Sequence, residues 1–306
     1  MQRLKLDETA LDLFARQPKR SFLTGLEFLD AATTTRHGKK YGFQPRQVIE
    51  ICGASDTPKT QVLEHIVASF LTKSSATCYK APKERVYIFD HEAKVSAIRL
   101  ASLVADKMAS YDRENAVDDA LGQVQICCCQ DTFQWLATLN HIHFQLLEAS
   151  PSSLMLVINS VGSFHSIDMM TAKRVGSGLA MSEQVYIFLK QFIRHHSPIV
   201  FAAKETTKGT RSSWEHAEYM PSSWTSQVSK RILLRVPSLR IQSLRSCEVE
   251  KNIADDEAST QFEARCIAVG ESLSFLCQIK QNRIVSYPFV KKTSPHTVQN
   301  QNQIED

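Results

Sequence analysis

The chain has 306 residues, of which 43% are hydrophobic and 22% are charged, a composition typical of a globular protein. Its net charge of +4 is compatible with a nucleic-acid partner but is too small to argue for one. No stretch approaches the roughly 18 apolar residues that a membrane span requires, and the N-terminal stretch MQRLKLDETALDLFARQ carries charges throughout. We therefore expect neither a membrane span nor a secretory signal.

Eight cysteines raise the question of a metal site or of disulfides. Three of them, Cys127 to Cys129, are consecutive in VQICCCQD, which we interpret as a buried strand. Neighbouring residues of a strand point to opposite faces, so these three thiols do not converge on one ion. The other cysteines are scattered and form no Cys-x-x-Cys pair. We expect free, buried thiols in a reducing compartment.

Short β-rich runs alternate with helical periodicity along the chain as far as residue 205. Strands that are apolar on both faces and alternate with helices are typical of a parallel sheet covered by helices on both sides. Strands are predicted at residues 46–53, 83–92, 122–129, 152–160 and 198–205, and helices at residues 62–71, 97–108, 132–149 and 182–196.

The pattern changes after Trp224, where consecutive strands joined by polar turns are predicted at residues 229–236, 263–269 and 273–287. We expect these strands to extend the same sheet in antiparallel fashion. The predicted organisation is an N-terminal docking segment (1–20), one α/β core (21–290) and a polar, Gln/Asn-rich tail (291–306) that we expect to be disordered.

The stretch GASDTPKTQ, which begins at Gly53, is similar to a phosphate-binding loop, whose frame is Gly, four residues, Gly, Lys and then Ser or Thr. Lys59 and Thr60 keep their places, but Pro58 stands where the second Gly belongs. The loop lies between a predicted strand and a predicted helix, where such loops bind phosphates through backbone N–H groups, a Lys and a hydroxyl that holds Mg²⁺. Pro58 removes one N–H donor and fixes φ. We therefore expect nucleotide binding to be weak or lost.

Polar residues end three of the predicted strands, at the edge of the sheet where a nucleotide would lie. Asn159 stands where phosphate-loop proteins usually have an Asp that holds Mg²⁺, and an amide lacks that charge. Asp90 or Glu92, in FDHE, could polarise an attacking water, or the two could form a solvated carboxylate pair. Lys204 and Glu205 are either sensors of the nucleotide state or surface charges.

Several segments, in order and spacing, resemble the core of the RecA-like recombinases. The opening of the core, SFLTGLEFLDAATTTRHGKKYGFQPRQVIEICGASDTPKTQ, is similar to the family's entry into the first strand and phosphate loop. YIFDHEAKVSAIRL, LMLVINSVGSF and IVFAAKETT resemble the three strand ends of the family's nucleotide site. PSSW followed by KRILLRV resembles the family's Gly-x-x-Trp and Arg-rich strand, so that the likeness covers residues 20–280.

The resemblance implies a RecA-like core in which Glu92 is the catalytic glutamate and Glu205 stands at the place of a Gln sensor. The departures from the family at Pro58, Asn159 and Glu205 imply that ATP and Mg²⁺ are bound weakly and that the chain is not an efficient ATPase.

The early segment ETALDLFARQPKRS resembles the opening of the X-ray repair cross-complementing type of recombinase paralogue. This likeness implies a nuclear protein that assembles with other paralogues, binds single-stranded or branched DNA, and supports the strand-exchange recombinase in homologous recombination and double-strand break repair. It implies no membrane partner.

Two predicted loops follow the fourth and fifth strands, at residues 168–178 and 206–221, and the resemblance places such loops against DNA. The first contains Lys173 and Arg174, and the second contains Lys208, Arg211 and Trp214. Basic residues with an aromatic side chain suit single-stranded DNA through phosphate attraction and base stacking. The alternative is a pair of mobile surface loops with incidental charges.

Three hypotheses remain open from the sequence. The first is a recombinase paralogue that acts through assembly and DNA binding. The second is an active RecA-like, DNA-dependent ATPase, in which Lys59, Thr60 and Glu92 suffice. The third is a phosphate-loop kinase or another nucleotide-dependent enzyme unrelated to DNA. Against it, no lid with clustered arginines follows the core, whereas the strand-rich residues 229–286 do.

Overall fold

The computed structural model describes residues 21–36, 39–75, 84–109, 115–148, 153–176, 179–206, 214, 216–237, 260–267, 273–280 and 282–289. The predicted docking segment and tail lie outside these ranges, as do Lys208 and Arg211.

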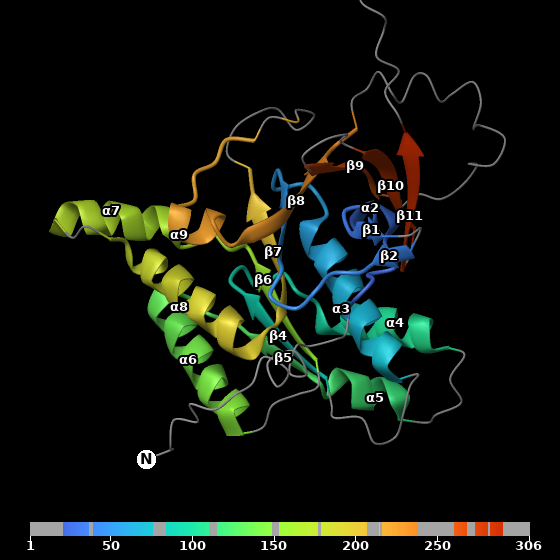
Figure 1. Cartoon of the computed structure of the whole chain (residues 1–306), viewed down its shortest axis with the longest axis horizontal. Coiled ribbons are helices and arrows are strands. Elements are labelled where there is room, and N and C mark those ends of the chain that lie inside the picture. The colour runs from blue at the N-terminus through green and yellow to red at the C-terminus, as the bar shows by residue number, and fades with distance from the viewer. Residues whose placement is uncertain are drawn as a thin grey trace, which may run out of the picture.

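A nine-stranded sheet in the order β11-β10-β9-β8-β3-β7-β6-β4-β5 forms the centre of the molecule (Figure 1). The strands from β8 to β5 in this order are parallel, and β9, β10 and β11 continue the sheet in antiparallel fashion. The predicted α/β class, with a mostly parallel sheet and antiparallel C-terminal strands, is confirmed. The strands are β3 Val48–Gly53, β4 Arg85–Asp90, β5 Val124–Cys127, β6 Leu154–Asn159, β7 Ile199–Glu205, β8 Val228–Arg235, β9 Thr260–Ile267, β10 Ser274–Lys280 and β11 Arg283–Phe289.

The helices lie on the two faces of this sheet. They are α2 Glu27–Asp30, α3 Lys59–Ser75, α4 Ala97–Met108, α5 Ala116–Leu121, α6 Thr132–Glu148, α7 His165–Val175, α8 Met181–His196 and α9 Ser222–Thr225. The four helices predicted from periodicity correspond to α3, α4, α6 and α8. A small hairpin of β1 Thr34–Arg36 and β2 Lys39–Tyr41 precedes β3. In the part of the chain described above, no helix has the length and apolar character that crossing a bilayer requires.

Alternation along the strands divides the core into two layers. Ile49 and Ile51 of β3 pack with α3, α4 and α5 on one face, whereas Val48 packs with α6 and α8 on the other. Figure 1 shows these two groups of helices on opposite sides of the sheet. Because strand side chains alternate between faces, the buried charged residues Glu50 and Lys204 point toward the α6 and α8 side.

The opening segment is held by one carboxylate. Asp30 accepts hydrogen bonds from the Thr24 backbone N–H and hydroxyl, both at 2.8 Å, and from the Gly25 N–H at 2.9 Å. The Asp30 side chain therefore closes a turn around Thr24 and Gly25, and α2 follows directly. This geometry gives a physical reason for the stretch TGLEFLD, residues 24–30, in the opening segment of the core.

Three expectations about the sheet and its loops are wrong. Strand β8 was expected to be antiparallel, but it pairs with β3 in parallel. Strand β5, which contains the first of the three consecutive cysteines, is not buried, because it forms the edge of the sheet and leaves Ile126 and Cys128 exposed. Most of the first predicted loop is helical: α7 continues to Val175, and Gly176 ends it in a left-handed conformation with φ of 74°.

Stability should fall as the solution is acidified from pH 7 toward pH 4, in part because of His65. Burial, together with Lys107 and Arg99, lowers the pKa of His65 to about 4. An unfolded histidine titrates near pH 6.5, so the unfolded chain binds the proton first, and the stabilisation is lost as the pH falls below about 6.5. The midpoint of urea unfolding should be lower at pH 5 than at pH 7, and His65→Gln should reduce this difference. Equal pH dependence in the variant would exclude a contribution from His65.

Candidate functional site

The candidate site lies where β3 passes through the phosphate loop into α3. A Cβ atom on Gly53 would meet the Thr57 hydroxyl and would lie 2.9 Å from the Leu234 carbonyl oxygen, so only glycine fits there. Pro58 immediately precedes α3, and its carbonyl accepts the Val62 N–H at 3.0 Å. A proline at the start of a helix removes an N–H that the helix itself does not use. The strand, the turn and the helix therefore follow one another as they do in a phosphate loop, although one potential donor to phosphate is missing.

The Lys59 side chain folds back into this loop. Its ammonium group donates to Gly53 O at 3.0 Å, to Ala54 O at 2.5 Å and to Thr57 Oγ1 at 3.3 Å. Burial lowers the pKa of Lys59, and the nearby carboxylates Glu205 and Glu92 partly offset this effect. The loop thus holds a cation where a phosphate-binding loop would hold an anion, and the same ammonium group is available to a phosphate that displaces the carbonyl contacts.

Thr60, Asn159 and Asp90 form a chain of hydrogen bonds across the sheet edge. The Thr60 hydroxyl donates to Asn159 Oδ1 at 3.2 Å, and Asn159 Nδ2 donates to Asp90 Oδ1 at 2.8 Å. The second Asp90 oxygen accepts the Val95 N–H at 2.8 Å. Hard divalent cations prefer carboxylate oxygens. Asp90 is the one carboxylate in this series of hydrogen bonds, and each of its oxygens already accepts a hydrogen bond. The residues at this position therefore do not fit a bound Mg²⁺ ion.

Glu92 is also occupied on both oxygens. The Ser160 hydroxyl donates to Oε1 at 2.6 Å, and the Lys94 ammonium lies 2.6 Å from Oε2. Partial burial raises the pKa of Glu92, but the hydrogen bonds and charges of Lys94, Ser160 and Lys59 outweigh burial and hold that pKa below its ordinary value. A carboxylate held in this way is a weak general base.

A pocket of about 340 Å³ opens beside the phosphate loop, between the beginnings of α3 and α4. Most of its lining residues have polar or charged side chains, among them the phosphate-loop residue Thr60 and the basic residues Lys94 and Arg99. Arg99 also lies 3.2 Å from the buried carboxylate of Glu64. The pocket has the size of a small-molecule site and adjoins the place where phosphates would bind.

Lys204 and Glu205 have different environments, although they are neighbours in the sequence. Glu205 is exposed at the end of β7, whereas the Lys204 side chain is fully buried. Lys204 Nζ lies 3.2 Å from Glu50 Oε1 and 2.8 Å from Glu218 Oε1. The surface interpretation of Lys204 is therefore wrong.

Arg231 and Trp224 complete a buried polar network around Glu50. Arg231 Nε lies 2.5 Å from Glu50 Oε1, and the Trp224 indole N–H donates to Glu50 Oε2 at 2.7 Å. Arg231 also reaches Glu218 at 2.6 Å. Two carboxylates thus face two cations on the α6 and α8 side of the sheet. The sequence contained one signal of this network, which is the presence of Glu50 and Lys204 inside the otherwise apolar runs VIEICG and IVFAAKE.

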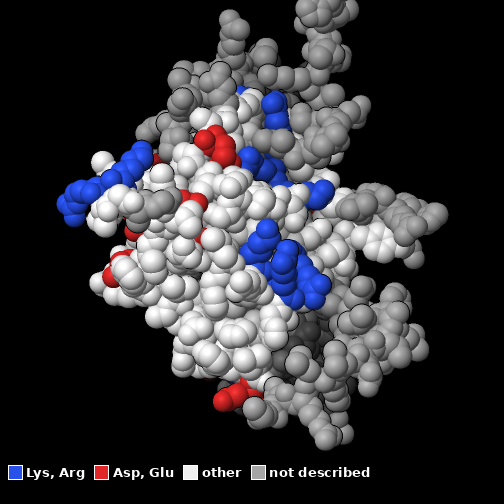
Figure 2. All heavy atoms as spheres, turned by 60° about the vertical axis from the view of Figure 1, so that its left-hand side comes forward, with Lys and Arg blue, Asp and Glu red and all other residues white. Residues whose placement is uncertain are grey.

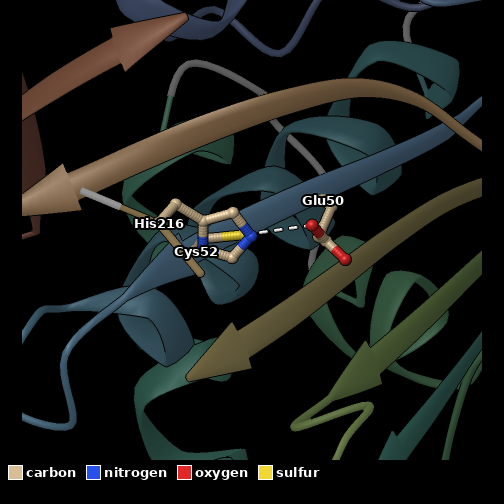
Figure 3. A group of neighbouring side chains, drawn as sticks. All are labelled: Glu50, Cys52 and His216. Carbon is tan, nitrogen blue, oxygen red and sulfur yellow. Dashed lines mark hydrogen bonds between the residues drawn. The ribbon is translucent and has the colours of Figure 1, made fainter. Parts of the chain in front are cut away.

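Glu50, Cys52 and His216 offer three potential metal ligands within 4.8 Å of one another. Figure 3 shows these three side chains side by side. Cations of the protein already occupy this position. Lys204 Nζ is 3.1 Å from His216 Nε2, and both Lys204 and Arg231 contact Glu50. Burial raises the pKa of the Cys52 thiol well above its ordinary value, so this sulfur is a poor ligand. The cluster is better described as part of the Lys204 network than as a metal site.

Of the residues predicted to bind DNA, Lys173, Arg174 and Trp214 lie in the described part of the chain. Lys173 and Arg174 are exposed in the last turn of α7. The Trp214 ring contacts the guanidinium groups of Arg235 and Arg265, at 4.1 and 4.3 Å from the ring centroid. A base that stacks on Trp214 would have to compete with these two cations. Figure 2 shows the Lys and Arg side chains of one face in several separate groups.

No protein-family model matches the chain. The chain is 25% identical over 215 residues to "DNA repair protein XRCC2" of Mus musculus, an alignment that covers 67% of this chain and 71% of the mouse protein. It is 24% identical over 272 residues to "DNA repair protein XRCC2 homolog" of Arabidopsis thaliana, which covers 65% of this chain and 71% of the plant protein. The chain is thus similar in sequence to these two XRCC2 proteins, and its mostly parallel sheet with antiparallel C-terminal strands is consistent with a RecA-like core.

Proposed function

We propose that the protein acts in DNA repair by recombination, as a paralogue that assembles with other recombinase paralogues, binds DNA and supports the strand-exchange recombinase in the nucleus. Both curated relatives are named as DNA repair proteins, which supports the repair role. The observation that carries the assembly role is the state of the nucleotide site. The strand, loop and helix are kept, while Asn159 bonds to Thr60 and Asp90 at the position of the Mg²⁺ ligand.

In this proposal ATP is a ligand that the protein binds weakly and does not hydrolyse efficiently. Lys59 would contact its phosphates, Gly53 and Thr60 would line the phosphate loop, and the adjoining pocket would accept the nucleoside. Glu92, the residue with the catalytic role in related recombinases, is held by Ser160 and Lys94. These contacts favour binding and assembly over turnover. The alternative, an active RecA-like ATPase, requires Glu92 to leave both partners.

Assembly with a partner paralogue should tolerate the loss of Lys59. Lys59→Ala removes the phosphate contact but leaves the sheet and its two cores unchanged, so a co-expressed partner paralogue should still co-purify. Deleting residues 1–20, the proposed docking segment, should abolish or strongly reduce co-purification. The readout is the stoichiometry of the purified complex. The reverse result, in which Lys59→Ala breaks the complex and the deletion does not, would mean that assembly depends on nucleotide binding.

DNA binding is proposed to be electrostatic, with little sequence preference and a preference for single strands. Lys173 and Arg174 lie exposed at the end of α7, and Lys208 and Arg211 belong to the second proposed DNA-binding loop. Each cation that neutralises a phosphate on single-stranded DNA contributes about −0.7 to the slope of log affinity against log salt. Trp214 would add stacking only where a base displaces the guanidinium groups beside it.

The double variant Lys173→Ala, Arg174→Ala should therefore reduce that slope by about 1.4 units. The measurement is fluorescence anisotropy of a labelled single strand, titrated with salt, on the complex with its partner paralogue. Lys190 and Arg194 offer a matched control, because they are also exposed cations on one helix, α8. Their double alanine variant carries the same charge change and should leave the slope unchanged. Equal slopes for both variants would place the DNA elsewhere or on a partner.

A further inference from the structure

The Mg²⁺ position of the nucleotide site is filled by hydrogen bonds within the protein. Asp90 and Asn159 are each only 2% exposed, and they are direct neighbours at the ends of β4 and β6. The Thr60 hydroxyl donates to the Asn159 amide oxygen, and the Asn159 amide nitrogen and the Val95 N–H each donate to one of the two Asp90 oxygens. A divalent cation at this position would have to break these hydrogen bonds, and it would gain the Thr60 hydroxyl, the neutral Asn159 amide oxygen and a single carboxylate, that of Asp90.

A second lysine borders the same pocket. Ala93 has φ of 51°, a left-handed conformation that turns the chain directly after Glu92, and Lys94 follows it. The Lys94 side chain lines the pocket together with Thr57 and Thr60. Lys94 is also close enough to Lys59 for its charge to lower the pKa of that residue. Two ammonium groups therefore approach the phosphate loop from different elements, one from α3 and one from the loop after β4.

We propose that the site binds the polyphosphate of a nucleotide without a divalent cation, and that Lys94 supplies the positive charge that the metal ion would otherwise bring. This inference rests on the proposed nucleotide site. The Lys94 side chain is 56% exposed, so it can turn from Glu92 toward a phosphate without leaving a buried charge behind. An exposed ion pair is weak, whereas charge-assisted hydrogen bonds to phosphate oxygens are strong. Phosphate would thus compete with Glu92 for the Lys94 ammonium group.

The proposal predicts opposite effects for the two members of the Lys94 and Glu92 pair. Lys94→Ala removes a charged contact to phosphate and should weaken metal-free binding by about tenfold, the size expected for one charge-assisted hydrogen bond. Glu92→Gln removes the competitor and should strengthen metal-free binding. Lys94→Arg keeps the charge and should retain most of the affinity. Lys190→Ala, which removes an exposed lysine on α8, is the matched control and should bind as the wild type does.

The test is an equilibrium titration of the full chain with a fluorescent N-methylanthraniloyl derivative of ATP, once in EDTA and once in Mg²⁺. The wild type should bind with affinities that differ by less than about threefold between the two conditions, because the metal adds no strong protein contact. Far-ultraviolet circular dichroism checks that each variant is folded. Because the Lys94 side chain is exposed, its substitution should not disturb the fold.

Two results would overturn the inference while leaving the proposed nucleotide site in place. One is wild-type binding that requires Mg²⁺, and the other is Lys94→Ala binding in EDTA with wild-type affinity. A different result, no binding by the wild type in either condition, would overturn the nucleotide site together with this inference. The DNA and assembly experiments would then decide the remainder of the proposed function independently.

Discussion

Replacing Lys204 with Met should lower the free energy of unfolding by about 3 kcal/mol or more at pH 7. The substitution removes one of the two cations that face Glu50 and Glu218, while the Glu50 side chain stays fully buried. Arg231 remains 2.5 Å from Glu50 Oε1 and limits the loss. Breaking a buried ion pair is costly because it leaves a charge without its partner, which solvent cannot reach. Urea unfolding followed by circular dichroism measures the change.

The pH dependence of this loss separates electrostatics from packing. In the wild type, burial raises the pKa of Glu50, but Lys204, Trp224 and Arg231 outweigh burial and hold it below its ordinary value. Without Lys204 the pKa of Glu50 should rise, so the folded variant binds a proton more readily than the unfolded chain, and acidification offsets part of the loss. The difference between wild type and variant should therefore be smaller at pH 5 than at pH 7.

Two controls complete this experiment. Lys190→Met makes the same substitution at an exposed position of α8 and should change the stability by less than about 0.5 kcal/mol. The double variant Glu50→Gln, Lys204→Met should lose less than the sum of the two single variants, because neither charge is then left alone. A loss that is additive and independent of pH would mean that Lys204 contributes through its hydrocarbon stem only.

The same network links the proposed DNA-binding region to the nucleotide strand. His216 and Glu218 belong to the second proposed DNA-binding loop, residues 206–221, and both contact Lys204. Glu50 lies on β3, whose end forms the phosphate loop, and the Thr206 N–H donates to Gly53 O at 3.0 Å. The described residues of this loop are thus bound to the strands that carry the nucleotide site. Loss of Lys204 should therefore affect the position of the loop as well as stability.

Periodicity predicted the main helices and the parallel strands, but the composition of the edge strand β5 led to a wrong prediction of its burial. The helix predicted at 97–108 coincides with α4, and the strand predicted at 152–160 contains β6. The run around Cys127 has the same apolar, β-rich composition, yet it forms the edge strand β5 with exposed side chains. The composition of a segment indicates that it forms a strand, but it does not indicate whether that strand lies at the edge or in the middle of the sheet.

Strand direction and loop structure also depend on contacts that are distant in sequence. Nothing in the sequence of β8 distinguishes a parallel from an antiparallel partner, and its pairing with β3 joins residues about 180 positions apart. The predicted loop 168–178 includes Gly176, which in the structure ends α7. The Glu50, Lys204 and Arg231 contacts are equally distant in the chain. The site residues of the phosphate loop were predictable because they lie within one short motif.

Asn159→Asp should make the fold depend on Mg²⁺, a property that the wild type should lack. The substitution replaces the Asn159 Nδ2 donor, 2.8 Å from Asp90 Oδ1, with a second carboxylate oxygen. Two buried carboxylates then face each other, and the hydrogen bond between these side chains is lost. The cost in EDTA at pH 7 should be about 2–3 kcal/mol, the size expected for an unsatisfied charged group in a buried position.

A divalent cation should reverse this loss, because the variant offers it two carboxylates and the Thr60 hydroxyl. Binding to the folded state alone stabilises it by RT ln(1 + [Mg²⁺]/Kd), so the unfolding temperature of the variant should rise with Mg²⁺ concentration. The wild type should show no such rise, and Asn140→Asp, which makes the same change at an exposed position of α6, should behave as the wild type does. Adding Pro58→Gly restores the missing backbone donor and should further strengthen nucleotide binding in Mg²⁺. Stabilisation of the wild type by Mg²⁺ to the same degree would show that Asn159 already serves as a metal ligand, and the nucleotide site would then have to be regarded as intact.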